Sequence, residues 1–197
     1  MTFEPPALRR QIQGFTMIEL IVVIVILGIL SAVALPRFTN MQRDARVAKL
    51  NAARGAVQAA AAMVHGAALA RAGQGAITVA GCTATTTAAG GGQICTESGA
   101  VNVVNWYPQA NLAGIISAAG LTSTFPATDA ALQADGYQRV GGGGAIGSSV
   151  TIRVTGGSNP AQCFFTYRPS NAAGAAGSTA LTGDVTPPGV GGSTTGC

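Results

Sequence analysis

Charged and aromatic side chains are scarce in this chain of 197 residues: 9% of its residues are charged, 5% are aromatic, and His65 is the single histidine. No set of side chains typical of nucleophilic or acid–base catalysis is evident. The run Gly141–Gly144 is not followed by the Lys-Ser/Thr of a phosphate-binding loop, so it predicts a flexible turn. Asp129 and Asp135 lack the neighbouring oxygen ligands that calcium requires, and we interpret His65 as an ordinary polar residue of a helix. We therefore expect no enzyme, no cofactor and no metal site.

A strongly charged domain surface is also missing, although the net charge is +4. Residues 1–71 carry eight Arg/Lys and three acidic residues, a balance of +5, whereas residues 72–197 carry three arginines and four acidic residues, a balance of −1. A nucleic-acid-binding domain normally gathers cations on one face, often beside stacking aromatic residues. The positive charge belongs to the N-terminal segment, so no specific nucleic-acid partner is expected.

The four cysteines, Cys82, Cys95, Cys163 and Cys197, lie in the C-terminal part of the chain. They include no Cys-x-x-Cys pair of the kind that indicates a zinc site. An even number of cysteines in an exported region indicates disulfides, and four cysteines allow three pairings. We favour Cys82–Cys95 with Cys163–Cys197, because each bond closes a local loop and the second holds a Gly/Pro-rich tail.

One long apolar run, Phe15–Leu35, contains a single carboxylate, Glu19. The run is just long enough to cross a bilayer as a helix, and a charge inside such a span usually has a partner or a function. A secretory signal peptide cut before Leu35 is one interpretation, but Glu19 interrupts its apolar core and Pro36 lies close to the cut. A plain membrane anchor is another. The basic residues after the run would then keep the rest of the chain in the cytoplasm, whereas the cysteines indicate export.

The heptapeptide Gly14-Phe15-Thr16-Met17-Ile18-Glu19-Leu20 supports a third interpretation. It resembles the cleavage and methylation site of type IV prepilins and pseudopilins. The resemblance implies that a membrane-embedded prepilin peptidase cuts between Gly14 and Phe15, and that Phe15 is then N-methylated. Glu19 stands at the position of the family's glutamate, and Met17 replaces the leucine that is more common there. We expect Glu19 to pair with the new amine of Phe15 in an adjacent subunit and to set the register between subunits.

A single helix is predicted from about Thr16 to Ala70. After Pro36, apolar residues recur at steps of three and four, which is typical of the buried face of an amphipathic helix (Leu50, Ala53, Val57, Ala61, Val64 and Ala68). Polar residues are expected on the rest of the circumference (Arg43, Asp44, Lys49, Asn51 and Gln58). A bend is expected at Gly28 and Pro36, since proline removes a backbone donor. After the apolar run comes Pro36-Arg37-Phe38-x-Asn40-x-Gln42-x-Asp44-Ala45-Arg46. This sequence most resembles pilins of the mannose-sensitive haemagglutinin type, a resemblance that covers residues 10 to about 70.

Beyond residue 71 the sequence predicts a β-rich head. Residues 72–99 are expected to form a loop closed by a disulfide. Four further segments have a recognisable composition: a strand at Ala100–Tyr107, a short helix at Asn111–Ala119 ended by Gly120, a hairpin formed by Ser149–Thr155 and Ala161–Tyr167, and a coil at Gly183–Cys197. The predicted fold class is α+β, with the long helix packed against one small antiparallel sheet of three to five strands.

These expectations define four segments: a leader (1–14), an apolar membrane-spanning and filament-core helix (15–36), its amphipathic continuation (37–71) and the head (72–197). The resemblance implies a pilus subunit that resides in the bacterial inner membrane with its head in the periplasm. An inner-membrane assembly platform would then polymerise it into an extracellular helical homopolymer for adhesion or motility. A pseudopilin of a type II secretion system is the alternative within the family. A conventionally secreted binding domain is the alternative of another class.

Overall fold

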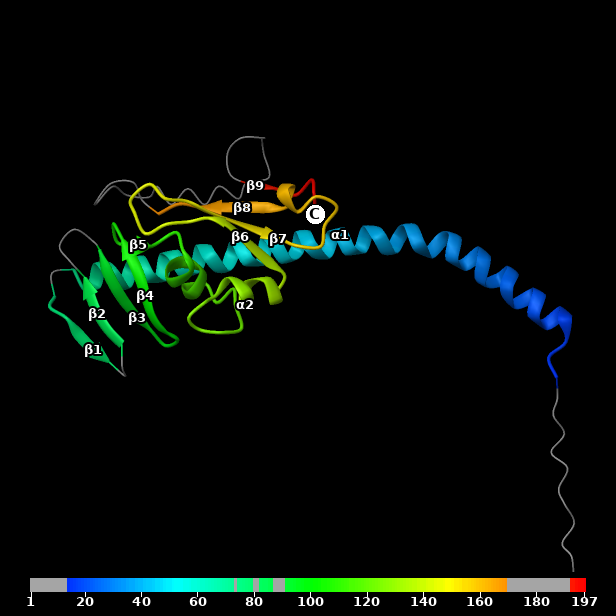
Figure 1. The fold of residues 1–197 in the computed structure, drawn as a ribbon, viewed down its shortest axis with the longest axis horizontal. Helices are drawn as coiled ribbons and strands as arrows, with labels where there is room; N and C mark the ends of the chain where they lie inside the picture. Colours follow the sequence, from blue (N-terminus) through cyan, green and yellow to red (C-terminus); the bar gives the residue numbers. More distant parts are fainter. Residues whose placement is uncertain (1–13, 73, 80–81, 87–90, 170–191) are drawn as a thin grey trace, which may run out of the picture. The chain divides into compact units, whose positions relative to one another are not determined.

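The computed structural model describes residues 14–72, 74–79, 82–86, 91–169 and 192–197. The predicted leader up to residue 13 and residues 183–191 of the predicted coil lie outside these ranges. The chain comprises two compact units, residues 1–42 and 43–197, and helix α1 (Met17–Ala70) contributes to both. Figure 1 shows α1 followed by the strands and short helices of the second unit. The predicted α+β class is confirmed.

The predicted long helix is confirmed, since α1 runs without interruption through Gly28 and Pro36. The bend at these two residues stays a prediction. In the second unit the predicted apolar face is buried, and each of its six residues is at most 4% exposed. The rest of the circumference is less polar than expected, because its exposed residues include many that are small and apolar (Ala45, Ala48, Ala52, Gly55, Ala59, Ala62 and Gly66). Several polar residues of the helix instead reach the head, as described below.

Among the described residues, nine short strands form two antiparallel sheets, where one sheet was expected. The first sheet has five strands in chain order: β1 (Ile77–Val79), β2 (Cys82–Thr86), β3 (Gly92–Thr96), β4 (Gly99–Val104) and β5 (Tyr107–Pro108). The loop predicted at residues 72–99 is therefore wrong, since three of these strands lie there. In β1 and β2 the exposed positions include Thr78, Thr83 and Thr85, which are β-branched and suit a strand, although they give little hydrophobic alternation. Ala84 in β2 and Ile94 in β3 are buried.

The second sheet has four strands: β6 (Tyr137–Gly141), β7 (Val150–Val154), β8 (Phe164–Tyr167) and β9 (Gly192–Ser193). Strands β7 and β8 are the predicted hairpin. The predicted coil is wrong at β9, which pairs with β8. The glycine run is not a free turn either. Gly141 belongs to β6, and the Gly143 amide donates to the Ala110 carbonyl at 2.9 Å, next to the end of β5.

Shorter elements connect the sheets. The strand predicted at Ala100–Tyr107 is divided into β4 and β5 by a tight turn at Asn105 and Trp106. The predicted short helix is present as a π-helical turn, η1 (Leu112–Ile116), and Gly120 adopts a positive φ of 60° soon after it. Helix α2 (Asp129–Ala134) was not expected. The Thr128 side chain caps its N-terminus by accepting a hydrogen bond from the Ala131 amide. The helix is short and has little apolar periodicity, so this capping residue alone did not predict it.

Two apolar clusters hold the sheets on α1. The larger joins the earlier buried positions of the helix, from Leu50 to Ala61, to β7, β8 and the segment around η1. The smaller joins the later part of the helix to β3, β4 and the β4–β5 turn (Val64, Ala68, Ile94, Val101, Val103 and Trp106). In Figure 1 both sheets lie along the part of α1 that contains these buried residues. The earlier apolar residues of the helix therefore support the second sheet, and the later ones support the first sheet.

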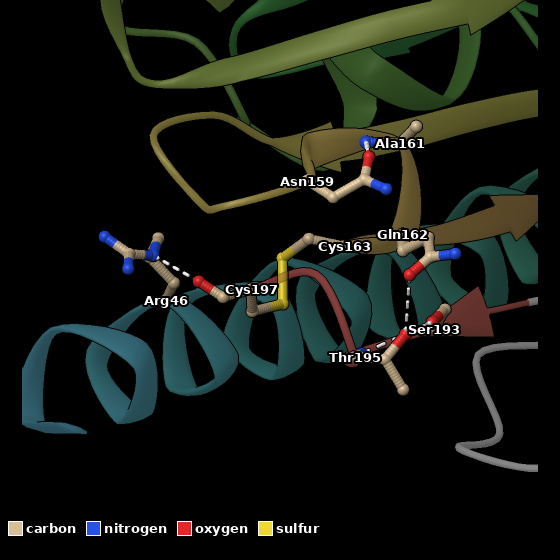
Figure 2. Close-up of a disulfide and its surroundings, with 8 residues drawn as sticks. All are labelled: Arg46, Asn159, Ala161, Gln162, Cys163, Ser193, Thr195 and Cys197. Carbon is tan, nitrogen blue, oxygen red and sulfur yellow. Dashed lines mark hydrogen bonds between the residues drawn. A yellow bond between two sulfur atoms is a disulfide. The ribbon is translucent and has the colours of Figure 1, made fainter. Parts of the chain in front are cut away.

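Two disulfides are present, Cys82–Cys95 and Cys163–Cys197, which is the pairing that closes local loops. The second bond is buried and fixes the C-terminal segment beside the turn that precedes β8 (Figure 2). In that region the Asn159 amide donates to the Gly196 carbonyl and the Gly196 amide donates to the Gln162 carbonyl, both at 3.1 Å. Thr195 adds a side-chain bond to Gln162 at 3.2 Å. The described C-terminal residues are thus an integral part of the head.

Side chains of α1 donate to main-chain carbonyls of three separate loops. Arg46 Nε donates to the Cys197 carbonyl at 2.5 Å (Figure 2). Lys49 Nζ donates to the Asp135 carbonyl at 2.6 Å and lies 4.5 Å from the centre of the Tyr137 ring. His65 Nδ1 lies 3.0 Å from the Trp106 carbonyl oxygen. The interpretation of His65 as an ordinary polar helix residue is therefore wrong, because its ring is half-buried against the head.

Candidate processing and assembly site

The predicted cleavage site lies immediately before the long helix. Residues 14–16 have no helical conformation, and α1 begins at Met17. A Cβ atom added at Gly14 would meet nothing within 4 Å, and the side chain of Phe15 is 91% exposed. The Gly14–Phe15 bond is therefore exposed and lies outside the helix.

Glu19 folds back onto the start of its own helix. Its Oε2 atom accepts hydrogen bonds from the Thr16 amide at 2.9 Å and from Thr16 Oγ1 at 2.8 Å. The Glu19 amide in turn lies 3.3 Å from Thr16 Oγ1. This reciprocal arrangement is a capping box, and it satisfies donors that have no partner within the helix. The Thr-x-x-Glu spacing is the sequence signature of a capping box, so this role of Thr16 could have been predicted from the sequence but was not.

The capping box matters more in an apolar environment than in water. Lipid offers no hydrogen-bond partners, so each unsatisfied amide there costs several kcal/mol. All atoms of the box belong to Thr16 and Glu19, which lie on the C-terminal side of the Gly14–Phe15 bond. The box is therefore compatible with cleavage at that bond.

The helix that follows has apolar side chains on its whole circumference. From Met17 to Leu35, its large apolar residues are all exposed within the chain. Among the described residues, α1 is the one helix that is long and apolar enough to cross a membrane. Such a surface needs a cover of lipid or of other protein chains.

The acidic residues considered for calcium have other partners. Both carboxylate oxygens of Asp129 accept hydrogen bonds from Arg139, at 2.9 and 2.8 Å, and these bonds lower the pKa of Asp129. The Asp135 carboxylate accepts a bond from the Ser123 amide at 2.8 Å. Within the described ranges, no group of three His, Cys, Asp or Glu side chains is placed to hold a metal ion.

A comparison with known protein families points to the same segment. Residues 9–35 match the family described as the prokaryotic N-terminal methylation motif. Over 51 residues, the chain is 49% identical to the "Type IV narrow pilus major component PilA5" of Thermus thermophilus. This stretch is 26% of the present chain and 44% of that pilin, so the chain spans less than half the length of the relative that it matches. No solved structure matches the chain significantly.

The N-terminal segment thus carries the methylation motif of prepilins. The chain is also homologous, over 51 residues, to part of a type IV pilin. The finer resemblance to pilins of the mannose-sensitive haemagglutinin type stays a prediction. The roles of Gly14, Phe15 and Glu19 in processing and assembly are inferences, which the next section develops.

Proposed function

We propose that this chain is a structural subunit of a type IV pilus and not an enzyme. The observation that carries the proposal is the order of features at the N-terminus. An exposed Gly14–Phe15 bond precedes a capped helix start, and a long exposed apolar helix follows. A prepilin peptidase cuts this bond, and Phe15 is methylated. The methylation motif at residues 9–35 and the similarity to a pilus component over 51 residues support this proposal.

The subunit resides in the bacterial inner membrane before assembly, with residues 15–36 in the bilayer and the head in the periplasm. The two disulfides support this orientation, because such bonds persist in oxidising compartments. An assembly platform in the inner membrane then transfers the helix from lipid into the core of an extracellular filament. Identical subunits joined by non-closing contacts form a helical homopolymer, which serves adhesion or motility.

Glu19 has two roles in this proposal. It caps its own helix through Thr16, and its remaining charge pairs with the Phe15 amine of an adjacent subunit. A pair of this kind contributes little net stability, but it can fix the register between neighbours. The two roles can be separated, because glutamine keeps the acceptor oxygen that a capping box needs but has no charge.

Mass spectrometry of the mature chain tests the processing step. A methylated Phe15 at the N-terminus is the expected result, and a mature chain that begins at Leu35 would instead identify a conventionally secreted protein. Gly14→Val is the matched control, because a side chain at this position should block cleavage and leave the leader in place. Long surface filaments at native expression would distinguish a pilin from a pseudopilin.

Two variants test the assembly step. Glu19→Ala should be cleaved and methylated but absent from sheared filaments. Glu19→Gln should keep the helix start and still fail to assemble if the charge sets the register. Normal filaments in the Glu19→Gln strain would show that the capping box alone accounts for this residue.

A further inference from the structure

The turn between β4 and β5 has an unusual backbone. Asn105 and Trp106 both adopt the left-handed region, with φ values of 47° and 68°. A two-residue hairpin turn with two positive φ values normally contains Asn-Gly, because glycine has no Cβ to clash. Here tryptophan stands where glycine is usual. L-residues other than glycine disfavour this conformation, so other contacts must hold the turn in place.

Two contacts with the turn and the residue after it come from His65 on α1. Its ring stacks on Tyr107, with 4.0 Å between ring centres and 9° between ring planes. Its Nδ1 atom lies 3.0 Å from the Trp106 carbonyl oxygen, and a carbonyl can only accept, so Nδ1 carries the hydrogen. Trp106 and Tyr107 are 9% and 7% exposed. One side chain of the helix therefore contacts the strained residue and its neighbour.

The five-stranded sheet is held on α1 by the smaller of the two apolar clusters. Of the described residues, six belong to it, against eighteen in the cluster under the other sheet. Trp106 is the largest of the six, and its indole keeps its place only while the turn keeps its conformation. Local opening begins where few apolar contacts hold an element, so the smaller cluster should open first.

The far side of the turn is tied to the other sheet. The Tyr167 hydroxyl donates to the Pro108 carbonyl at 2.8 Å, and the Gly143 amide donates to the Ala110 carbonyl at 2.9 Å. The first bond ends on β5, the second lies two residues beyond it, and neither involves the helix. They provide a pivot about which the first sheet can move while the second stays closed.

We propose that the β4–β5 turn is a latch. The five-stranded sheet opens from α1 as a unit while β6–β9 stay packed, and His65 is the positioning residue that holds the latch shut. Opening exposes Val64 and Ala68 of the helix and the indole of Trp106. The proposal does not depend on the function proposed above.

Trp106 is the single tryptophan of the chain, so its fluorescence reports the latch without a label. The full-length protein in detergent micelles is titrated with urea. Tryptophan emission is followed together with hydrogen exchange of peptides that cover β7 and β8. In the wild type, the emission change should precede the loss of protection in β7 and β8.

Three variants sharpen the test. His65→Ala should raise the open population about tenfold at low urea, since it loses both a hydrogen bond and a ring stack. His65→Phe keeps the stack and loses the donor, so it should have a smaller effect. Gly66→Ala is the matched control, because this neighbouring position is exposed and has no atom within 4 Å of an added Cβ. It should leave the separation of the two transitions unchanged.

Coincident transitions in the wild type and in both His65 variants would overturn the latch. A shift of both transitions together in His65→Ala would also overturn it, because that result indicates a general structural role. If His65→Ala does not fold, the comparison between His65→Phe and the wild type decides by the same criterion.

Discussion

Replacing Tyr167 by phenylalanine tests how the two sheets are joined. Tyr167 lies on β8 and is fully buried, and its hydroxyl donates to the Pro108 carbonyl of β5 at 2.8 Å. Phenylalanine keeps the ring and its packing but removes the donor. The buried Pro108 carbonyl is then left without this partner, so the variant isolates one bond between the sheets.

The expected loss is about 1–3 kcal/mol of the free energy of unfolding, because a buried acceptor without its donor keeps its desolvation cost. For a unit of this size each kcal/mol corresponds to about 2–4 °C in melting temperature. A loss of about 2 kcal/mol, the middle of the range, should therefore lower the melting temperature by about 4–8 °C. Circular dichroism of the full chain in detergent measures it. Tyr137→Phe is the control, since this half-buried ring on β6 keeps its contact with the Lys49 ammonium.

Tyr167 should also make the stability of the protein depend on pH. Burial, with a contribution from Tyr107, raises the pKa of Tyr167. A tyrosine in the unfolded chain ionises near pH 10, so above that pH the unfolded state releases a proton that the folded state keeps. The contribution of Tyr167 to the free energy of unfolding is therefore fully present below about pH 10. Above that pH it falls by up to about 1.4 kcal/mol per pH unit.

Phenylalanine has no proton to lose, so the difference in stability between the wild type and Tyr167→Phe should shrink as the pH rises from 9.5 to 11. Equal stability of the two proteins at pH 7 would refute the role of the bond. A difference that stays constant up to pH 11 would refute the reasoning on ionisation.

Four further substitutions have defined outcomes. Gly142→Ala should lower the free energy of unfolding by about 2 kcal/mol, because the residue has a φ of 112° and an added Cβ would lie 2.7 Å from the Ala110 carbonyl. Gly55→Ala, in open space on α1, should instead raise it by about 0.5–1 kcal/mol, and urea titration of both variants checks the contrast. Cys163→Ala removes the Cys163–Cys197 bond, which closes a loop of 34 residues, and should lower the free energy of unfolding by about 4 kcal/mol. The melting temperature should fall accordingly, and an unchanged melting temperature would contradict the chain-entropy argument. Arg139→Gln should cost less than about 1 kcal/mol, because its partner Asp129 is half-exposed, and high salt should reduce the difference from the wild type.

The long helix could be predicted from the sequence because its signals are local and repeated. Positions 50 to 68 follow the helical period, and the apolar run before them is continuous and long enough for a helix across a membrane. The local pairing of the cysteines also follows from their order along the chain. These features depend on residues that are close in sequence.

The first sheet could not be predicted in the same way. Its strands β1 and β2 are rich in threonine, and the hydrophobic alternation that marks a strand is weak there. Strand β1 pairs with β2, and β2 pairs with β3 farther along the chain. His65 was misjudged for a related reason. Its partners, Trp106 and Tyr107, lie about forty residues away, and nothing in the helical pattern indicates them.

The bonds from Arg46, Lys49 and His65 all end on main-chain oxygens. Every residue type has such an oxygen, so these attachments do not require a particular side chain at the accepting position. Mutations in the accepting loops can accumulate without loss of an acceptor, provided that the backbone keeps its course. The three donors on the helix lack this freedom. Related chains that share the fold should therefore diverge faster in the loops than at the donor positions, and the surface of the head can change while its attachment to the helix stays the same.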